Sequence, residues 1–149
     1  MGKKALFSGT FDPFTTGHHA LIRRALCFSD EIIIAIGVNT EKKTMFSLDE
    51  RLEKIKSIFA KEKRIKVTTY DSLTVDFAKE SGADFILRGI RNIHDFEYEK
   101  SMAEINRKLS GIETVFLFSE PEYGYISSSL VRDLIKYKKD ISNLIPDAK

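Results

Sequence analysis

The amino-acid sequence predicts an α/β fold in which five parallel strands form a doubly wound sheet with helices on both faces. Five short apolar segments, rich in residues that favour strands, alternate with segments whose apolar residues recur at helical spacing. The second apolar segment contains IIIAI, which is apolar at every position and therefore suits a strand covered on both sides. Strict alternation of strands and helices favours parallel pairing with right-handed crossovers.

Start signals and periodicity define the individual elements in order. The first strand is the apolar run ALF, and the loop after it ends at a glycine that opens the first helix. The helix after the second strand begins at Ser47, with Glu50 three positions on, as in a capping box. The third and fourth strands, IKVTT and DFILR, are separated by a short helical segment. A long helix follows, then the strand ETVFLF, and the last helix begins at a run of serines.

The expected boundaries follow from these signals. Strands are expected at residues 4–7, 31–38, 65–69, 84–88 and 113–118, and helices at residues 17–28, 48–61, 74–81, 95–109 and 128–136. The fourth helix is expected to carry one apolar face, made of Tyr98, Met102, Ile105 and Leu109.

Length and composition indicate a single domain that spans residues 1–149. A chain of this size buries roughly two thirds of the surface that it exposes when unfolded, which is enough for one core. The sequence contains no internal repeat, low-complexity tract or flexible linker, and its three prolines fall in expected loops or near the tail. We expect the tail, KYKKDISNLIPDAK, to form a solvated helix end and a docking segment.

The charge and hydropathy pattern argues against several classes of protein. The net charge is only +2, with basic and acidic residues interleaved, so nucleic-acid binding is not expected. No stretch approaches the ~18 consecutive apolar residues that a membrane span needs. The first residues lack the apolar run and cleavage site of a secretory signal, and we therefore expect a cytoplasmic protein.

The single cysteine, Cys27, has no partner for an internal disulfide and no neighbouring cysteine with which to share a metal. We expect it to be buried and inert.

Ligands of open α/β sheets bind beyond the carboxyl ends of the strands, so the loop SGTFDPFTTGHH after the first strand is the first candidate site. Gly9 is expected to give a phosphate close access to the backbone, and the helix that starts at Gly17 offers free amides and a positive dipole end. The loop is neither a Walker A loop nor a G-x-G-x-x-G fingerprint, which argues against a kinase-type NTPase and a nicotinamide enzyme. His18 can direct an imidazole or imidazolium donor at a bound anion.

The other two histidines are expected to be bystanders, His19 on the flank of the helix and His94 in a loop. A zinc site made from His18 and His19 is not expected, because adjacent helical positions diverge.

Three further loops at the same edge carry cationic or anion-binding groups. Lys42 and Lys43 either close over a negatively charged acceptor or form a solvated pair. Arg88 and Arg91 flank Gly89 at the end of the fourth strand, and a guanidinium that emerges from a buried strand is costly unless it meets an anion. The serines of ISSSLVR stand at a helix start with Arg132 one turn later, where they either grip phosphate or only cap the helix.

These loops combine many anion-binding groups with no activated nucleophile. No serine, histidine and acid form a recognisable triad, and no paired carboxylates are evident. The chemistry predicted is phosphoryl or nucleotidyl transfer by positioning and charge stabilisation.

Three motifs carry a family resemblance that covers nearly the whole chain. GTFDPFTTGH resembles the T/H-x-G-H signature of the nucleotidyltransferase superfamily, and ISSSLVR resembles its I-S-S-T/S-x-x-R motif. RGIRNIHDFEYE, with Asn106 and Arg107, resembles a segment of the bacterial phosphopantetheine adenylyltransferase family. The resemblance implies a Rossmann-like nucleotidyltransferase fold and an enzyme that joins ATP and 4'-phosphopantetheine into dephospho-coenzyme A and pyrophosphate, with Mg²⁺ and as a homohexamer.

The resemblance also implies roles for individual residues. The catalytic residues are expected to be His18, which stabilises the transition state, with Lys42 and Arg91, which hold reacting phosphates. ATP is expected to contact Gly9, Thr10, Phe11, His18, Gly89, Ile90, Arg91, Glu99, Gly124, Tyr125, Ile126, Ser127, Ser128, Ser129 and Leu130. The acceptor is expected to contact Thr10, Lys42, Thr74 and Arg88, and no protein metal ligands are expected.

The chain departs from the family pattern at a few positions. Ser8 stands where many members have proline, Thr16 where many have asparagine, and Ser129 where the wider superfamily often has threonine. These differences affect only the fine geometry of the loops.

The attacking group that the resemblance implies explains why the sequence shows no residue placed to act as a general base. The phosphate of 4'-phosphopantetheine has a second pKa near ~6 and is largely dianionic at neutral pH. Two alternatives remain: a related transferase that uses nicotinamide mononucleotide, or glycerol phosphate with CTP, and a nucleotide-binding regulator without turnover. The segment RGIRNIHDFEYE argues against the first, and the presence of His18 and Arg91 against the second.

Overall fold

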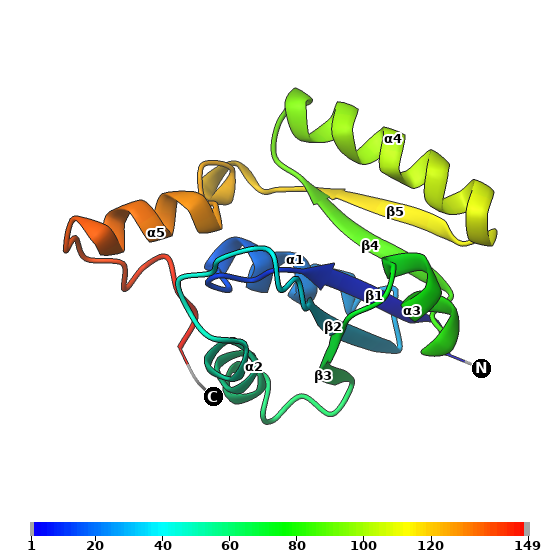
Figure 1. Ribbon diagram of the computed structural model, residues 1–149, viewed down its shortest axis with the longest axis horizontal. Helices are drawn as coiled ribbons and strands as arrows, with labels where there is room; N and C mark the ends of the chain where they lie inside the picture. Colours follow the sequence, from blue (N-terminus) through cyan, green and yellow to red (C-terminus); the bar gives the residue numbers. More distant parts are fainter. Residues whose placement is uncertain (1, 148–149) are drawn as a thin grey trace.

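The structure is a computed structural model that describes residues 2–147, and it contains the expected alternation of strands and helices (Figure 1). The strands are β1 (Lys4–Gly9), β2 (Glu31–Gly37), β3 (Ile65–Tyr70), β4 (Phe85–Ile90) and β5 (Glu113–Phe118). The helices are α1 (Thr16–Ala25), α2 (Leu48–Ile58), α3 (Thr74–Glu80), α4 (Ile93–Ser110) and α5 (Ser128–Lys136), with a short 3₁₀ helix at Pro121–Tyr123 before α5.

All strand pairs of the sheet are parallel, in the order β3-β2-β1-β4-β5. The chain winds outward from β1 to β3, then crosses to the other side of β1 to form β4 and β5. The winding direction therefore reverses between β1 and β4, and the loops that follow these two strands flank the switch point where open α/β sheets bind ligands.

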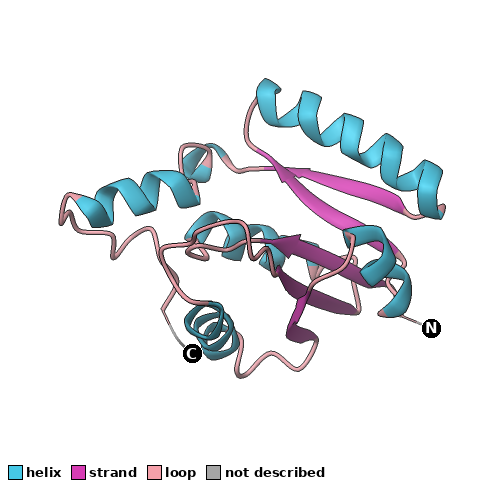
Figure 2. Cartoon of the chain, viewed as in Figure 1, coloured by secondary structure: helices cyan, strands magenta, loops and turns pink. Residues whose placement is uncertain are grey.

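Helices cover both faces of the sheet, as the apolar run in β2 predicts (Figure 2). Ile32, Ile34 and Ile36 pack with α1 and α2 in one buried cluster. Ile33 and Ala35 point to the opposite face, where they pack with α3 in a second cluster. The doubly wound α/β prediction is confirmed.

Most element boundaries lie within a few residues of those expected, and side-chain caps explain two of the differences. The first helix begins at Thr16 because Thr15 is its N-cap. The fourth begins at Ile93, because the side chain of Asn92 accepts a hydrogen bond from the amide of Asp95 at 2.9 Å. The Ser47 start of α2 is confirmed, since its hydroxyl accepts from the amide of Glu50.

The burial prediction for Cys27 is wrong, and the apolar face expected on the fourth helix is present but uncovered. Cys27 is exposed, because it lies in the turn after α1 ends at Ala25. The apolar face of α4 is present but not buried: Tyr98, Ile105 and Leu109 remain 64%, 51% and 63% exposed. The only residue of α4 that is buried is Glu99.

The tail docks as expected. Leu144 packs with Ile126 and Val131 in a third, smaller cluster, and its carbonyl accepts a hydrogen bond from the amide of Thr16 at 2.9 Å. This contact ties the C-terminal segment to the start of α1. None of the helices within residues 2–147 is long and apolar enough to cross a membrane.

Candidate active site

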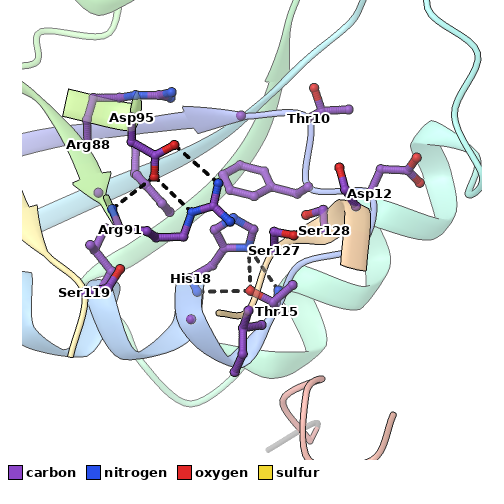
Figure 3. A pocket seen from close by; sticks show the side chains of 18 of the residues that line it. Thr10, Asp12, Thr15, His18, Arg88, Arg91, Asp95, Ser119, Ser127 and Ser128 are labelled. Carbon is purple, nitrogen blue, oxygen red and sulfur yellow. Dashed lines mark hydrogen bonds and ion pairs between the residues drawn. The ribbon is translucent and has the colours of Figure 1, made fainter. Parts of the chain in front are cut away.

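The carboxyl ends of β1 and β4 border a cavity of about 440 Å³, into which α1 and α5 direct their first residues (Figure 3). Thirteen of the residues expected at the site line it: Gly9, Thr10, Phe11, His18, Lys42, Arg88, Gly89, Arg91, Glu99, Ile126, Ser127, Ser128 and Ser129. The loops chosen from the sequence therefore border most of this cavity, and their roles toward ligands stay a prediction.

A second cavity, of about 510 Å³, adjoins the first and lies between β1, α3 and α4. Thr74 belongs here, with its hydroxyl 2.9 Å from that of Tyr70. The two cavities share one wall, made of Ser8, Gly9, Thr10, Lys42, Arg88 and Glu99. Two ligands placed in them would meet at this wall.

Four expected residues line neither cavity: Ile90, Gly124, Tyr125 and Leu130. Ile90 is buried in the core, and Tyr125 is 65% exposed. They belong to the segments that the motifs mark, but they do not line either cavity.

The first loop is shaped by aromatic packing as well as by ligand access. A Cβ at Gly9 would lie 3.0–3.1 Å from the ring of Phe11, so the glycine makes room for that ring. Phe11 itself has a φ of 52°, a left-handed conformation that is unfavourable for a bulky residue. Packing against Phe11 is thus a second reason for a glycine here, beside the predicted access for a phosphate, which stays a prediction because Gly9 also lines both cavities.

His18 is the third residue of α1 and closes a capping box with Thr15. The hydroxyl of Thr15 accepts from the amide of His18, and the amide of Thr15 donates to Nδ1 of His18 at 3.0 Å. Because Nδ1 accepts this bond, the proton of the neutral ring is on Nε2. The ring thus offers one N–H donor in the cavity that it lines (Figure 3).

Burial keeps this imidazole neutral. The ring is packed among Phe7, Phe11 and Phe14, with ring centroids 5.1–6.1 Å away. This burial, and then the charges of Arg88 and Arg91, lower the pKa of His18 from 6.5 to about 3. Of the imidazole and imidazolium forms considered from the sequence, the structure supports the neutral one.

The other histidines lie outside both cavities. His19 stacks on Phe59 at 5.5 Å, and His94 lies in the first turn of α4 rather than in a loop. Within residues 2–147, no group of three or more His, Cys, Asp or Glu side chains is placed to hold a metal ion.

Arg88 meets a carboxylate of the protein itself. Its Nε and Nη2 donate to the two oxygens of Glu99 at 2.9 and 2.6 Å, and its Nη1 donates to the carbonyl of Ser8 at 2.8 Å. Burial lowers the pKa of Arg88, but the bonds and charge of Glu99 outweigh it and hold the pKa above its ordinary value. From the sequence, a ligand was expected to supply the anion that pairs with Arg88, and Glu99 was expected to contact ATP.

Arg91 has the same kind of partner one turn earlier on α4. Its Nε donates to Asp95 at 3.0 Å, and its backbone amide donates to the same carboxylate oxygen at 3.0 Å (Figure 3). Asp95 and Glu99 stand four residues apart and therefore share one helix face. That spacing is the signal from which both pairs could have been predicted.

Lys42 and Lys43 differ although they are adjacent. The Nζ of Lys42 donates to the hydroxyl of Thr10 at 3.3 Å, and Lys42 lines both cavities. Lys43 is exposed and lines neither. Lys42 is therefore placed where it could meet an acceptor, whereas Lys43 is solvated.

The serine hydroxyls at the start of α5 are already engaged. Ser127 caps the helix by accepting from the amide of Leu130, and Ser128 donates to the carbonyl of Pro13 at 2.8 Å. Ser129 accepts from Arg132 at 3.0 Å. The hydroxyls hold the motif in place, while the first amides of a helix lack partners within it and remain suited to an anion.

Sequence reasoning missed several lining residues, among them Asp12, Thr15, Asp95, Ser119 and Tyr123. The clearest missed signal is Thr15, a good N-cap residue directly before a helical segment. Asp12 carried no such signal, because its partners lie 33 and 34 residues further along the chain.

The site as a whole suits two phosphorylated ligands. One cavity offers helix starts, Arg91 and a neutral histidine donor, and the shared wall adds Lys42 and Arg88. Such groups bind phosphates and stabilise charge that develops during transfer between them.

Residues 6–134 match the cytidylyltransferase-like family. The chain is 55% identical to phosphopantetheine adenylyltransferase of Bacteroides thetaiotaomicron over 145 residues, which cover 97% of this chain and 96% of the relative. It is 53% identical to the protein of the same name from Flavobacterium psychrophilum over 146 residues, covering 98% and 97% of the two chains.

Solved structures with low sequence identity share the fold. A bifunctional NMN adenylyltransferase/ADP ribose pyrophosphatase from Francisella tularensis superposes with a TM-score of 0.74 at 18% identity, over 97% of this chain and 45% of that one. A lipopolysaccharide core biosynthesis protein from Thermoplasma volcanium gives 0.58 at 19% identity, over 80% and 98%.

Proposed function

This chain belongs to the phosphopantetheine adenylyltransferase family, and we propose from that premise that its two joined cavities hold ATP and 4'-phosphopantetheine. The enzyme transfers the adenylyl group of ATP to 4'-phosphopantetheine, which gives dephospho-coenzyme A and pyrophosphate, a step of coenzyme A synthesis. The observation that carries the assignment of the cavities is their shared wall.

The first cavity is assigned to ATP. A triphosphate needs several donors, and this cavity collects the starts of α1 and α5 together with Arg91. The second cavity is assigned to the acceptor. Its walls include apolar side chains outside α4, such as Val75 and Ile86, which suit the uncharged pantetheine arm.

The reacting phosphates then meet at Thr10, Lys42 and Arg88, the part of the wall that offers a hydroxyl and two cations. An oxygen of the acceptor phosphate forms the new bond to the α-phosphorus of ATP. The bond from that phosphorus to the bridging oxygen breaks, and pyrophosphate leaves with the electron pair. Since the attacking phosphate is already ionised, no general base is required.

His18 is assigned to the transferring group. Its Nε2–H lies in the first cavity and, as a neutral donor, can bond an oxygen of the α-phosphoryl group as negative charge increases there. Lys42 and Arg88 offset the repulsion between the two phosphates and hold the acceptor in line. Arg91 holds the ATP phosphates.

Mg²⁺ is proposed to enter with ATP, bound to its phosphates. The two aspartates of the first cavity are both occupied, Asp12 by two backbone amides and Asp95 by Arg91. The donor set therefore fits a metal carried by the nucleotide better than a metal held by the protein, and the ion would neutralise part of the phosphate charge.

We extend the proposal to a cytoplasmic homohexamer, as the family resemblance implies. The exposed apolar face of α4, at Tyr98, Met102, Ile105 and Leu109, supports self-association, because monomeric proteins seldom leave contiguous apolar surface of this kind uncovered.

The acceptor assignment is tested by product identity. The protein is incubated with Mg²⁺ and ATP, each acceptor is offered in turn, and pyrophosphate release is followed with mass identification of the product. We expect turnover with 4'-phosphopantetheine and little with nicotinamide mononucleotide, or with glycerol phosphate and CTP. Turnover with another acceptor alone would contradict the assignment.

The assignment of the cavities is tested by two arginine variants. Arg88→Ala should mainly raise the acceptor KM, and Arg91→Ala should mainly raise the ATP KM. The reverse pattern would mean that ATP binds in the second cavity and the acceptor in the first.

A further inference from the structure

We infer that Asp12 and Arg51 form a clamp that holds the loop of residues 38–47 against the first loop and thereby positions Lys42 for the acceptor phosphate. Neither residue is among those that the motifs single out for ligand contact. The inference rests on the role proposed above for Lys42.

Asp12 connects the two loops directly. Its side chain is buried, with 3% of the residue exposed. One carboxylate oxygen accepts from the amide of Met45 at 2.8 Å, and the other accepts from the amide of Phe46 at 2.9 Å. Both oxygens of a buried charge are thus used to bind the end of the loop that carries Lys42.

Arg51, on α2, connects the same two loops a second time. It lies in the first turns of α2 and is 8% exposed. Its Nη1 donates to the carbonyl of Thr10 at 2.8 Å, while its Nε donates to the carbonyls of Phe46 and Ser47 at 3.1 and 3.3 Å. One planar guanidinium therefore fixes the distance between the first loop and the loop end.

The first loop is itself anchored on its far side. The carbonyl of Asp12 accepts from Nη1 of Arg132 at 2.9 Å, which ties the clamp to α5. A shift of the Lys42 loop therefore cannot be followed by the first loop without breaking this bond as well.

The other end of the Lys42 loop is also fixed. The amide of Val38 donates to the carbonyl of Tyr70 at 2.8 Å, which continues the pairing of β2 with β3. Lys42 lies between this point and the clamp, in a turn where its amide donates to the carbonyl of Asn39. Pinning both ends of the loop restricts where the Lys42 ammonium can lie.

Restricting the position of the Lys42 side chain matters because a lysine side chain is flexible. Its long side chain has many rotamers, and the loss of that freedom on binding opposes affinity. In the structure the ammonium already lies 3.3 Å from the hydroxyl of Thr10, on the wall that the two cavities share. Asp12 and Arg51 are therefore positioning residues that act through Lys42.

A double-mutant cycle tests the clamp. Asp12→Asn, Lys42→Ala and the double variant are compared with the unaltered enzyme for kcat, acceptor KM and ATP KM. An asparagine has only one acceptor oxygen and would turn its NH₂ toward the second amide, so one loop bond is lost. We expect about a tenfold rise in acceptor KM for Lys42→Ala and about a threefold or larger rise for Asp12→Asn.

The double variant is decisive, because a purely structural role would make the two effects add. If Asp12 acts through Lys42, Asp12→Asn should change acceptor KM less than about twofold once Lys42 is already alanine. An equal further rise in that background, or no effect of Asp12→Asn in the native background, would overturn the clamp alone. No effect of Lys42→Ala would overturn the proposed role of Lys42 and the clamp with it.

Asp84→Asn is the matched control. The carboxylate of Asp84 also accepts from a distant backbone amide, that of Lys4 at 2.8 Å, but at the opposite edge of the sheet. It should leave both KM values unchanged. If Asp12→Asn does not fold, Arg51→Lys gives a second route, since it keeps the charge and removes the planar fork; it should raise acceptor KM in the native background and not in that of Lys42→Ala.

Discussion

Glu99 holds Arg88 through both carboxylate oxygens, at 2.9 Å from Nε and 2.6 Å from Nη2. This pair connects α4 to β4 within the wall that the two cavities share. The side chain of Glu99 is 11% exposed and that of Arg88 is 30% exposed, so the pair is only partly accessible to water. The orientation of Arg88 toward a ligand therefore depends on a residue of a different element.

Removal of this carboxylate should affect both stability and acceptor binding. Glu99→Gln leaves the Arg88 charge partly buried with a weaker partner, and we expect the free energy of unfolding to fall by about 2 kcal/mol. The acceptor KM should rise as well, because Arg88 loses its fixed orientation. Urea unfolding and steady-state kinetics measure the two effects. Glu104→Gln, which breaks only the exposed pair with Lys100, is the control and should change neither.

His18→Ala should lower kcat by about a hundredfold or more, with a small change in ATP KM, because it removes a donor that acts in the transition state. His19→Ala is the control, since His19 stacks on Phe59 and lines neither cavity. Its kcat should stay near that of the unaltered enzyme. Near-normal turnover by the His18 variant would remove that residue from the mechanism.

His18 should remain neutral across the physiological pH range. Its pKa is lowered to about 3, so the ring proton should stay on Nε2 between pH 5 and 8, which ¹⁵N chemical shifts of the imidazole report. A midpoint between pH 6 and 7 would contradict this assignment.

The lowered pKa of His18 also makes the free energy of unfolding depend on pH. In the unfolded chain the imidazole has its ordinary pKa of 6.5, so only the unfolded state gains a proton as the pH falls below that value. The contribution of His18 to the free energy of unfolding is therefore complete above pH 6.5 and is lost as the pH falls toward about 3. Urea unfolding at pH 7.5 and pH 5 should show a larger loss for the unaltered protein than for His18→Gln.

Thr15→Ala removes the side-chain half of the capping box that holds His18. The loss of the bond from the His18 amide to the Thr15 hydroxyl should lower the free energy of unfolding by about 1 kcal/mol. Because the same residue orients the imidazole, kcat should fall several-fold. Thr15→Ser keeps the hydroxyl and should restore most of both values. Equal behaviour of the two variants would show that the cap does not depend on the hydroxyl.

The exposed apolar face of α4 should be the contact between copies of the chain. Ile105→Glu places a charge in the middle of this face and should shift the protein to smaller species in sedimentation velocity. Because Ile105 also borders the second cavity, the measurement that decides is the size of the assembly and not the acceptor KM. Lys100→Glu, on the other side of the same helix, should leave the assembly intact. An unchanged assembly in the Ile105 variant would exclude this face as the interface.

The fold followed from the sequence because its signals are local. The unbroken apolar run in β2 reported burial on both faces, and Ser47 marked the start of α2, since each depends on neighbouring residues only. The apolar face of α4 shows the limit of this reasoning. Periodicity predicts which residues share a face, but not whether another part of the same chain covers it.

The site was predictable as a set of loops and less so as a set of contacts. The helix starts and the two arginines at the end of β4, Arg88 within the strand and Arg91 directly after it, could be placed because strand ends of a parallel sheet meet at one edge. The partners of Arg88 could not, since Glu99 lies on a later helix and Ser8 on another strand. Gly9 was assigned to ligand access because nothing local reveals that the Phe11 ring lies against it.

The strand order also has a consequence for the time at which the protein becomes functional. β4 joins β1 across 80 residues of sequence, in the register that pairs Leu6 with Ile86, and the serines that complete the first cavity come another 40 residues later. During synthesis β1 to β3 can pair early, but such a nascent sheet carries only the first loop and the Lys42 loop and lacks the segments after β4 and β5 that line the same cavity. The enzyme therefore gains its ligand-binding surface only when nearly all of the chain has left the ribosome.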